Sequence, residues 1–197
     1  MKYFWIAALI FLGGCTTQPH IVEYRIVPNL EIQASSNSQC KGKSLKIAPV
    51  FTSSSLMSQT MKYTTEEFKE FAFTESEWAV TPNRAIGNAL ERALREKKIF
   101  ASVSSFRSRS RADLLLESSV DEFIQHFYSN NKKSSVKVSL FANLVDNKNS
   151  KSLASKTFTK ELAVEQLNAK AGVEALNKAL KEVLQEELQW LEQQQCQ

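Results

Sequence analysis

Residues 112–127 read Ala-Asp-Leu-Leu-Leu-Glu-Ser-Ser-Val-Asp-Glu-Phe-Ile-Gln-His-Phe, and this stretch decides the fold. The continuous apolar run Leu114-Leu115-Leu116 is typical of a strand that is buried on both faces. Val120, Phe123 and Phe127 continue the apolar pattern beyond that run. We therefore expect residues 112–127 to form the central strand of a sheet.

The next two segments form a hairpin that extends this sheet. In residues 136–145, Val138, Leu140, Ala142 and Leu144 alternate with other residues, as in a strand with one buried face. The sequence Asp-Asn-Lys-Asn at 146–149 has the chemistry of a turn. Residues 151–162 then return as the partner strand.

Two amphipathic helices flank these strands. The first begins at Pro82-Asn83 and has a stripe of apolar residues at helical spacing. The second spans residues 168–193. Its apolar stripe consists of Val173, Leu176, Leu180, Val183, Leu184, Leu188 and Leu191, and its polar side includes Lys178, Lys181, Glu182, Glu186 and Glu187.

Shorter strands precede each helix. Residues 44–51 predict the first strand, with Pro49 at an edge or a bulge because proline cannot donate to the ladder. Segments 57–63 and 68–73 indicate a hairpin, with a short helix over 66–70 as the alternative, and 99–106 is a further strand. This order predicts an α+β fold: an antiparallel sheet with two helices packed on one face, in a single domain.

The N-terminus contains a lipoprotein signal. Lys2 is followed by an apolar run over residues 3–12, which is too short to span a bilayer as a helix. The run ends in Leu-Gly-Gly-Cys15, which resembles the bacterial lipobox; an ordinary secretory signal is the alternative. We expect residues 1–14 to be the signal peptide, 15–43 a lipidated N-terminus and polar tether, and 44–193 the domain. The residue after Cys15 is Thr16 and not Asp. By resemblance to bacterial lipoproteins, the lack of that retention signal favours the outer membrane, on its periplasmic face.

Two cysteines remain once Cys15 is lipidated, and they allow one bridge, Cys40 with Cys196. The periplasm permits disulfides. Such a bridge would join the start of the domain to the end of its last helix. Two unpaired thiols are the alternative.

The composition argues against catalysis and against nucleic-acid binding. The chain has 43% hydrophobic and 23% charged residues and a formal net charge of +4, which is too small for a nucleic-acid-binding surface. It has no glycine-rich phosphate loop and no metal-binding motif, and His20 and His126 lie in unrelated contexts. We expect no enzyme activity, no cofactor and no metal site.

Two features are candidates for partner binding. Arg107, Arg109 and Arg111 form a basic run that can meet lipid head groups or an acidic partner, or can be a solvated loop. Trp78, together with Phe68, Phe71 and Phe73, forms either a docking patch or part of the sheet core.

Several segments occur in an order that resembles a known family. They are Tyr24-Arg-Ile-Val-Pro28, Glu77-Trp-Ala79, Leu90-Glu-Arg-Ala-Leu94, Phe100-Ala-Ser-Val103 and Ala112-Asp-Leu-Leu-Leu-Glu117. After a lipobox, this order resembles the ABC-type transport auxiliary lipoprotein family, which includes the PqiC-like lipoproteins, over about residues 24–185.

The resemblance implies a non-catalytic lipoprotein of the outer membrane. It would serve an MCE-domain protein of an ABC-type system that moves phospholipids or other apolar molecules, and ATP hydrolysis would belong to the inner-membrane transporter. Association with copies of itself is a further expectation. A lipoprotein that assists periplasmic assembly or activates a cell-wall synthase is the alternative function.

Overall fold

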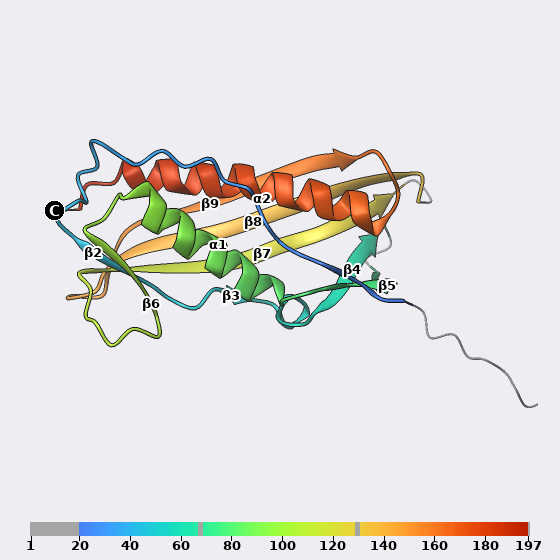
Figure 1. Cartoon of the computed structure of the whole chain (residues 1–197), viewed down its shortest axis with the longest axis horizontal. Helices are drawn as coiled ribbons and strands as arrows, with labels where there is room; N and C mark the ends of the chain where they lie inside the picture. The colour runs from blue at the N-terminus through green and yellow to red at the C-terminus, as the bar shows by residue number, and fades with distance from the viewer. Residues whose placement is uncertain (1–19, 67–68, 129–130, 197) are drawn as a thin grey trace, which may run out of the picture.

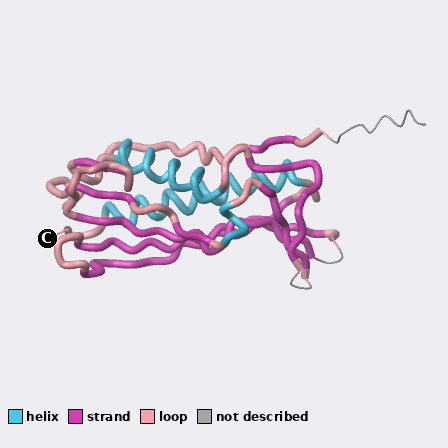
Figure 2. Tube along the Cα trace, turned by 90° about the horizontal axis from the view of Figure 1, so that it is seen from below, coloured by secondary structure: helices cyan, strands magenta, loops and turns pink. Residues whose placement is uncertain are grey.

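The central strand predicted from residues 112–127 is β7 (Leu114–Tyr128), and the sheet is organised around it. The computed structural model describes residues 20–66, 69–128 and 131–196, and within these ranges the strands form one nine-stranded sheet. Both α-helices lie on one face of that sheet (Figures 1 and 2). The predicted α+β class, with two helices on one face of a single domain, is confirmed.

The other elements are as follows. The strands are β1 (Val22–Tyr24), β2 (Ser44–Ile47), β3 (Phe51–Thr52), β4 (Thr60–Thr65), β5 (Glu70–Trp78), β6 (Ser102–Ser105), β8 (Lys133–Asp146) and β9 (Lys151–Val164). The helices are α1 (Pro82–Lys97), α2 (Ala169–Glu192) and the short 3-10 helix η2 (Ser54–Met57).

The sheet is mixed, which corrects the expectation of an antiparallel sheet. One edge of β7 pairs with β8 in the antiparallel sense, and β8 pairs likewise with β9. The other edge of β7 pairs in the parallel sense with β2, β3 and β4 in turn. The chain passes through β5, α1 and β6 before it returns as β7, and a long crossover of this kind allows parallel pairing.

A β-bulge keeps one face of β7 in the core along the whole strand. Leu114, Leu116 and Val120 are buried at even positions. The register with β8 shifts between Val120 and Glu122, and beyond it Phe123 and Phe127 are buried at odd positions. The extra residue of the bulge moves the odd positions onto the core face, so that Phe123 and Phe127 point inward in this 15-residue strand.

Each α-helix begins where the sequence predicts its start. Pro82 occupies the first turn of α1, where its missing N–H leaves no hydrogen bond unmade. Asn168 caps α2, because its side chain accepts a hydrogen bond from the backbone N–H of Ala171 at 2.9 Å. One residue departs from the predicted pattern: Glu187, predicted to lie on the polar side of α2, is buried.

The N-terminal segment corrects the predicted tether over residues 15–43. From Val22 onward the chain is packed on the domain: β1 pairs in parallel with β5, and residues 25–39 run along α2 (Figure 1). We call residues 25–39 the N-terminal strap. The side chain of Asn177 on α2 holds the strap, since it accepts from Val27 N at 2.6 Å and donates to Arg25 O at 3.2 Å.

Candidate docking surface

The two ends of the elongated domain differ in what they carry. We call the end at Leu114 of β7 the disulfide end and the end at Tyr128 the hairpin end. The described chain enters near the hairpin end, where β1 pairs with β5, and it ends at the disulfide end (Figure 1). Cys15, the predicted lipidation site, lies outside the described residues.

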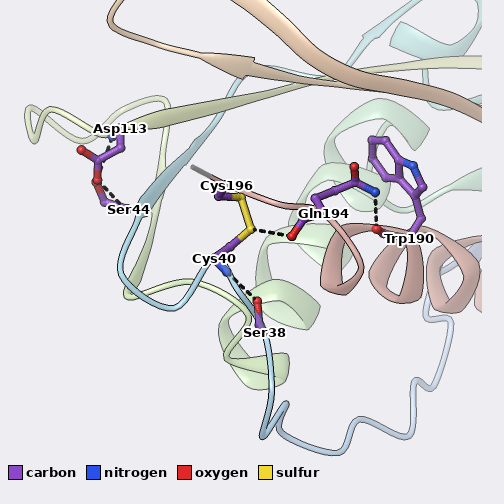
Figure 3. Close-up of a disulfide and its surroundings, with 7 residues drawn as sticks. All are labelled: Ser38, Cys40, Ser44, Asp113, Trp190, Gln194 and Cys196. Carbon is purple, nitrogen blue, oxygen red and sulfur yellow. Dashed lines mark hydrogen bonds between the residues drawn. A yellow bond between two sulfur atoms is a disulfide. The ribbon is translucent and has the colours of Figure 1, made fainter.

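Cys40 and Cys196 form a disulfide at the disulfide end, with their Cα atoms 5.0 Å apart (Figure 3). Both residues are buried. The backbone N–H of Cys40 donates to Ser38 Oγ at 3.1 Å, which fixes the end of the strap beside the bridge. The disulfide therefore joins the strap and the end of α2 across 156 positions of the sequence.

Trp78 is buried, with 4% of its surface exposed, so of its two predicted roles the core role fits and the tentative partner-binding role does not. Its ring centroid lies 5.6 Å from that of Phe123 on β7. Its backbone N–H donates to Gln59 O at 2.7 Å. Of the aromatic residues grouped with it in the sequence, Phe71 is exposed at the hairpin end, and Phe68 lies outside the described residues.

The predicted basic run lies in the connection between β6 and β7, and we call residues 106–112 the basic loop. Arg107, Arg109 and Arg111 are all exposed. Local hydrogen bonds fix the conformation of the loop. Ser108 N donates to Ser105 O at the end of β6 at 3.0 Å, and Ser110 N donates to Ser108 Oγ at 3.2 Å. The three guanidinium groups are therefore presented by a structured loop at the disulfide end.

The base of this loop is fixed by Asp113. Its carboxylate accepts from Ser44 N at 2.7 Å and from Ser44 Oγ at 2.6 Å (Figure 3). These hydrogen bonds stabilise the ionised form and lower the pKa of Asp113. Asn147 contributes from the β8–β9 turn, since its side chain donates to Ala112 O at 2.9 Å. The loop thus leaves the sheet from a fixed point between β2 and that turn.

A groove of about 380 Å³ lies beside the basic loop, between α1 and the segment that links β2 to β3. We call it the α1 groove, and its lining includes Ile47, Val50, Gly87, Arg84, Phe106 and Arg107. Gly87 lets α1 approach closely here, because a Cβ at this position would lie 3.1 Å from Val50 Cγ2. Phe106 is half exposed, and Arg107 lies over its ring at 5.5 Å.

Glu187 is a buried carboxylate at a position predicted to lie on the polar side of α2. Only 1% of its surface is exposed, and neither carboxylate oxygen has a hydrogen-bond partner. Burial without a compensating donor raises its pKa to about 8. Its position in the helical repeat indicates burial, because residue 187 lies three positions after Leu184 and four before Leu191, on the apolar stripe.

Among residues 20–66, 69–128 and 131–196, no group of three or more His, Cys, Asp or Glu side chains is arranged to hold a metal ion. His126 forms a hydrogen bond with Thr64 Oγ1 on the neighbouring strand β4, and His20 is exposed. The arrangement at the disulfide end is instead that of a surface: exposed cations, an exposed aromatic ring and a groove.

The family model described as ABC-type transport auxiliary lipoprotein component matches residues 28–186. The chain belongs to this family. Members of the ABC-type transport auxiliary lipoprotein component family are described as auxiliary components and not as catalytic ones. Among the described residues of this family member, no helix has the length and apolar character needed to cross a membrane.

Solved structures share the fold of this auxiliary lipoprotein. The crystal structure of protein XCC0632 from Xanthomonas campestris is 18% identical, with a TM-score of 0.74 over 85% of this chain and 93% of that one. The hypothetical protein CT253 from Chlamydia trachomatis is 9% identical, with a TM-score of 0.51 over 79% of this chain and 98% of that one. At these identities the likeness extends to the fold alone. No curated protein matches the chain in sequence.

Proposed function

We propose that this auxiliary lipoprotein is anchored to the periplasmic face of the outer membrane through acylated Cys15. There it docks onto an MCE-domain protein of an ABC-type system that carries phospholipid or another apolar solute. Its own role is non-catalytic. The observation that carries the proposal is the family match over residues 28–186, together with the lipobox that precedes it.

The docked N-terminal segment supports a short connection to the membrane. Only residues 16–21 separate Cys15 from β1, and a fully extended chain of this length spans at most about 25 Å. An acyl anchor would therefore keep the hairpin end near the membrane surface. Tethering of this kind raises the effective concentration of the domain for a partner in the same envelope, so a modest intrinsic affinity is sufficient.

Replacing Cys15 with Ser tests the anchor. We expect Cys15→Ser to leave the membrane pellet and appear in the soluble periplasmic fraction, while Cys40→Ser, a matched cysteine variant, stays with the membranes. Sucrose-gradient separation of wild-type membranes should place the protein with the outer membrane. Full membrane retention of Cys15→Ser would contradict the lipobox, and wild-type protein in the inner-membrane fraction would contradict the outer-membrane assignment.

Chemical crosslinking in intact cells, followed by affinity purification of the tagged lipoprotein, tests the partner. We expect an MCE-domain protein among the crosslinked products, and its recovery should depend on co-expression of the transporter. Recovery of a peptidoglycan synthase or a secretion-channel subunit in its place would overturn the transport role and favour the alternative function.

A further inference from the structure

The basic loop lies far from the point where the chain enters the domain. Tyr24 of β1 pairs with Trp78 of β5, and the ring of Trp78 packs against the ring of Phe123 on β7. Phe123 therefore shows how far along β7 the strand β1 lies. Phe123 is nine residues along β7 from Leu114, which is roughly 30 Å in a strand. The basic loop lies beyond Leu114, at the opposite end from the N-terminal entry (Figure 1). The point where the described chain begins and the basic loop thus lie at opposite ends of the molecule.

The charge of this loop is not neutralised within the part of the chain that the structure describes. No carboxylate there lies within ion-pair distance of Arg107, Arg109 or Arg111. The carboxylates around the loop and the groove are already engaged. Glu91, which lines the groove, forms an ion pair with Arg95 on α1. Asp113 accepts hydrogen bonds from Ser44, and Asp146 accepts from Lys148 N at 2.8 Å within its own turn. Three like charges within five residues therefore repel one another until an acidic group approaches.

The α1 groove adjoins this charge and adds an apolar component. Phe106 and Arg107 belong to both the groove and the basic loop, so a ligand in the groove contacts the loop. The floor includes Ile47 and Val50, and Arg84 supplies a further cation from α1. An apolar site beside several unpaired arginines is complementary to an apolar side chain flanked by carboxylates.

We infer that the basic loop and the α1 groove bind an acidic segment of the transport partner, with carboxylates at the arginines and one apolar side chain in the groove. This inference rests on the proposed function, because it takes the anchored orientation from Cys15 and deepens the docking step. A protein segment fits better than a lipid surface. The loop is at the end remote from the point where the described chain begins, and the groove is also lined by Asn83 and Asn88, whose side-chain amides suit a peptide backbone.

The test uses the full-length lipoprotein in cells, with the photo-crosslinking residue p-benzoylphenylalanine in place of Phe106. This position is aromatic and half exposed, so the exchange leaves the fold intact. The same probe is placed in two charge-reversal backgrounds. One is Arg107→Glu, Arg109→Glu, Arg111→Glu. The other is a matched control on exposed lysines elsewhere, Lys132→Glu, Lys170→Glu, Lys178→Glu. Both backgrounds change the net charge equally.

We expect the probe to crosslink to a partner segment that mass spectrometry shows to be rich in Asp and Glu. The adduct should fall at least about tenfold in the arginine background and remain in the lysine control, since close charge pairs across an interface commonly contribute that much. An undiminished adduct in the arginine background would overturn the inference, as would a phospholipid adduct or a crosslink to a second copy of this chain.

Two further outcomes separate this inference from the proposed function. If chemical crosslinking recovers the MCE-domain protein but the Phe106 probe does not, docking occurs elsewhere and the inference fails while the function stands. If the probe captures an acidic segment of a cell-wall synthase, the binding chemistry stands and the transport role fails.

Discussion

Gly172 in the first turn of α2 leaves no room for a side chain above Gln125 of β7. A Cβ atom at Gly172 would lie 2.6 Å from Cδ of Gln125, well inside van der Waals contact. Gln125 has little freedom to move, because it is 2% exposed and its Nε2 donates to Ser134 Oγ at 2.9 Å. The missing side chain therefore sets how closely α2 approaches the sheet.

We expect Gly172→Ala to lower the free energy of unfolding by about 1–3 kcal/mol through overpacking, although alanine is the better helix former. Urea denaturation measures the change. Gly42→Ala is the matched control, because nothing lies within 4 Å of a Cβ there, and it should be neutral. The double variant Gly172→Ala, Gln125→Ala should differ from the sum of its single variants. A Gly172→Ala variant as stable as wild type would show that Gln125 can move aside.

Glu187 should make the free energy of unfolding depend on pH. Its pKa is about 8 when folded and near the ordinary 4.5 when unfolded. Between these values the folded state keeps a proton that the unfolded state loses. Stability therefore falls as pH rises from 4.5 to 8, by up to about 1.4 kcal/mol per pH unit, and levels off above 8.

Urea unfolding of wild type and Glu187→Gln over pH 5–9 isolates this contribution. The free energy of unfolding of wild type should fall relative to that of Glu187→Gln as the pH rises from 5 to 8. Above pH 8 the difference between the two proteins should level off. Glu174→Gln, an exposed position on the same helix, should follow wild type at every pH. Parallel curves for wild type and Glu187→Gln would mean that Glu187 keeps the same pKa in both states.

The bridge between Cys40 and Cys196 closes a long loop, so its removal should act mainly through the unfolded state. We expect Cys40→Ser, Cys196→Ser to lower the free energy of unfolding by about 2–4 kcal/mol. Reductant should destabilise wild type similarly and leave the double variant unchanged. Peptide mapping without reduction should recover the two cysteines linked, and free thiols at both positions in protein isolated from the periplasm would refute the pairing.

Trp78→Ala should destabilise the domain by roughly 3–5 kcal/mol, because it removes a buried ring that packs on Phe123. Phe51→Ala is the control, since that ring is 64% exposed and its loss should change stability little. Thermal denaturation compares the two. A small loss of stability for Trp78→Ala, together with weaker recovery of the partner in crosslinking, would instead assign Trp78 to the partner interface.

Elements with a strong local pattern could be predicted from the sequence. Pro82 and Asn168 mark the starts of α1 and α2 because capping and the first-turn preference of proline are local effects. The alternation through Val138 and Leu140 likewise gives β8 its inward face. The direction of pairing is not local. Nothing in residues 44–65 indicates that β2, β3 and β4 align in parallel with β7, because that depends on the path of the intervening chain.

The packing of the N-terminal strap also lay beyond the local pattern, whereas the helical spacing of Glu187 did indicate its burial. The strap contributes Ile26, Leu30 and Ile32 to the edge of the core, and its fixed path also depends on Asn177, some 150 positions away. Glu187 was assigned by its charge, whereas its position on the helix places it among leucines. At the candidate site, the arginines were visible in the sequence. The α1 groove was not, since segments from β2, α1 and β6 form it together.

The disulfide determines how the molecule would respond to tension between a membrane anchor and a bound partner. Force applied at the N-terminal end would first peel away β1 and the strap, whose residues 22–39 extend to roughly 60 Å. Unravelling would stop at Cys40, because the bridge passes the load directly to the end of α2. The strap is thus a reserve of length that can be released while residues 40–196 stay closed in one covalent ring.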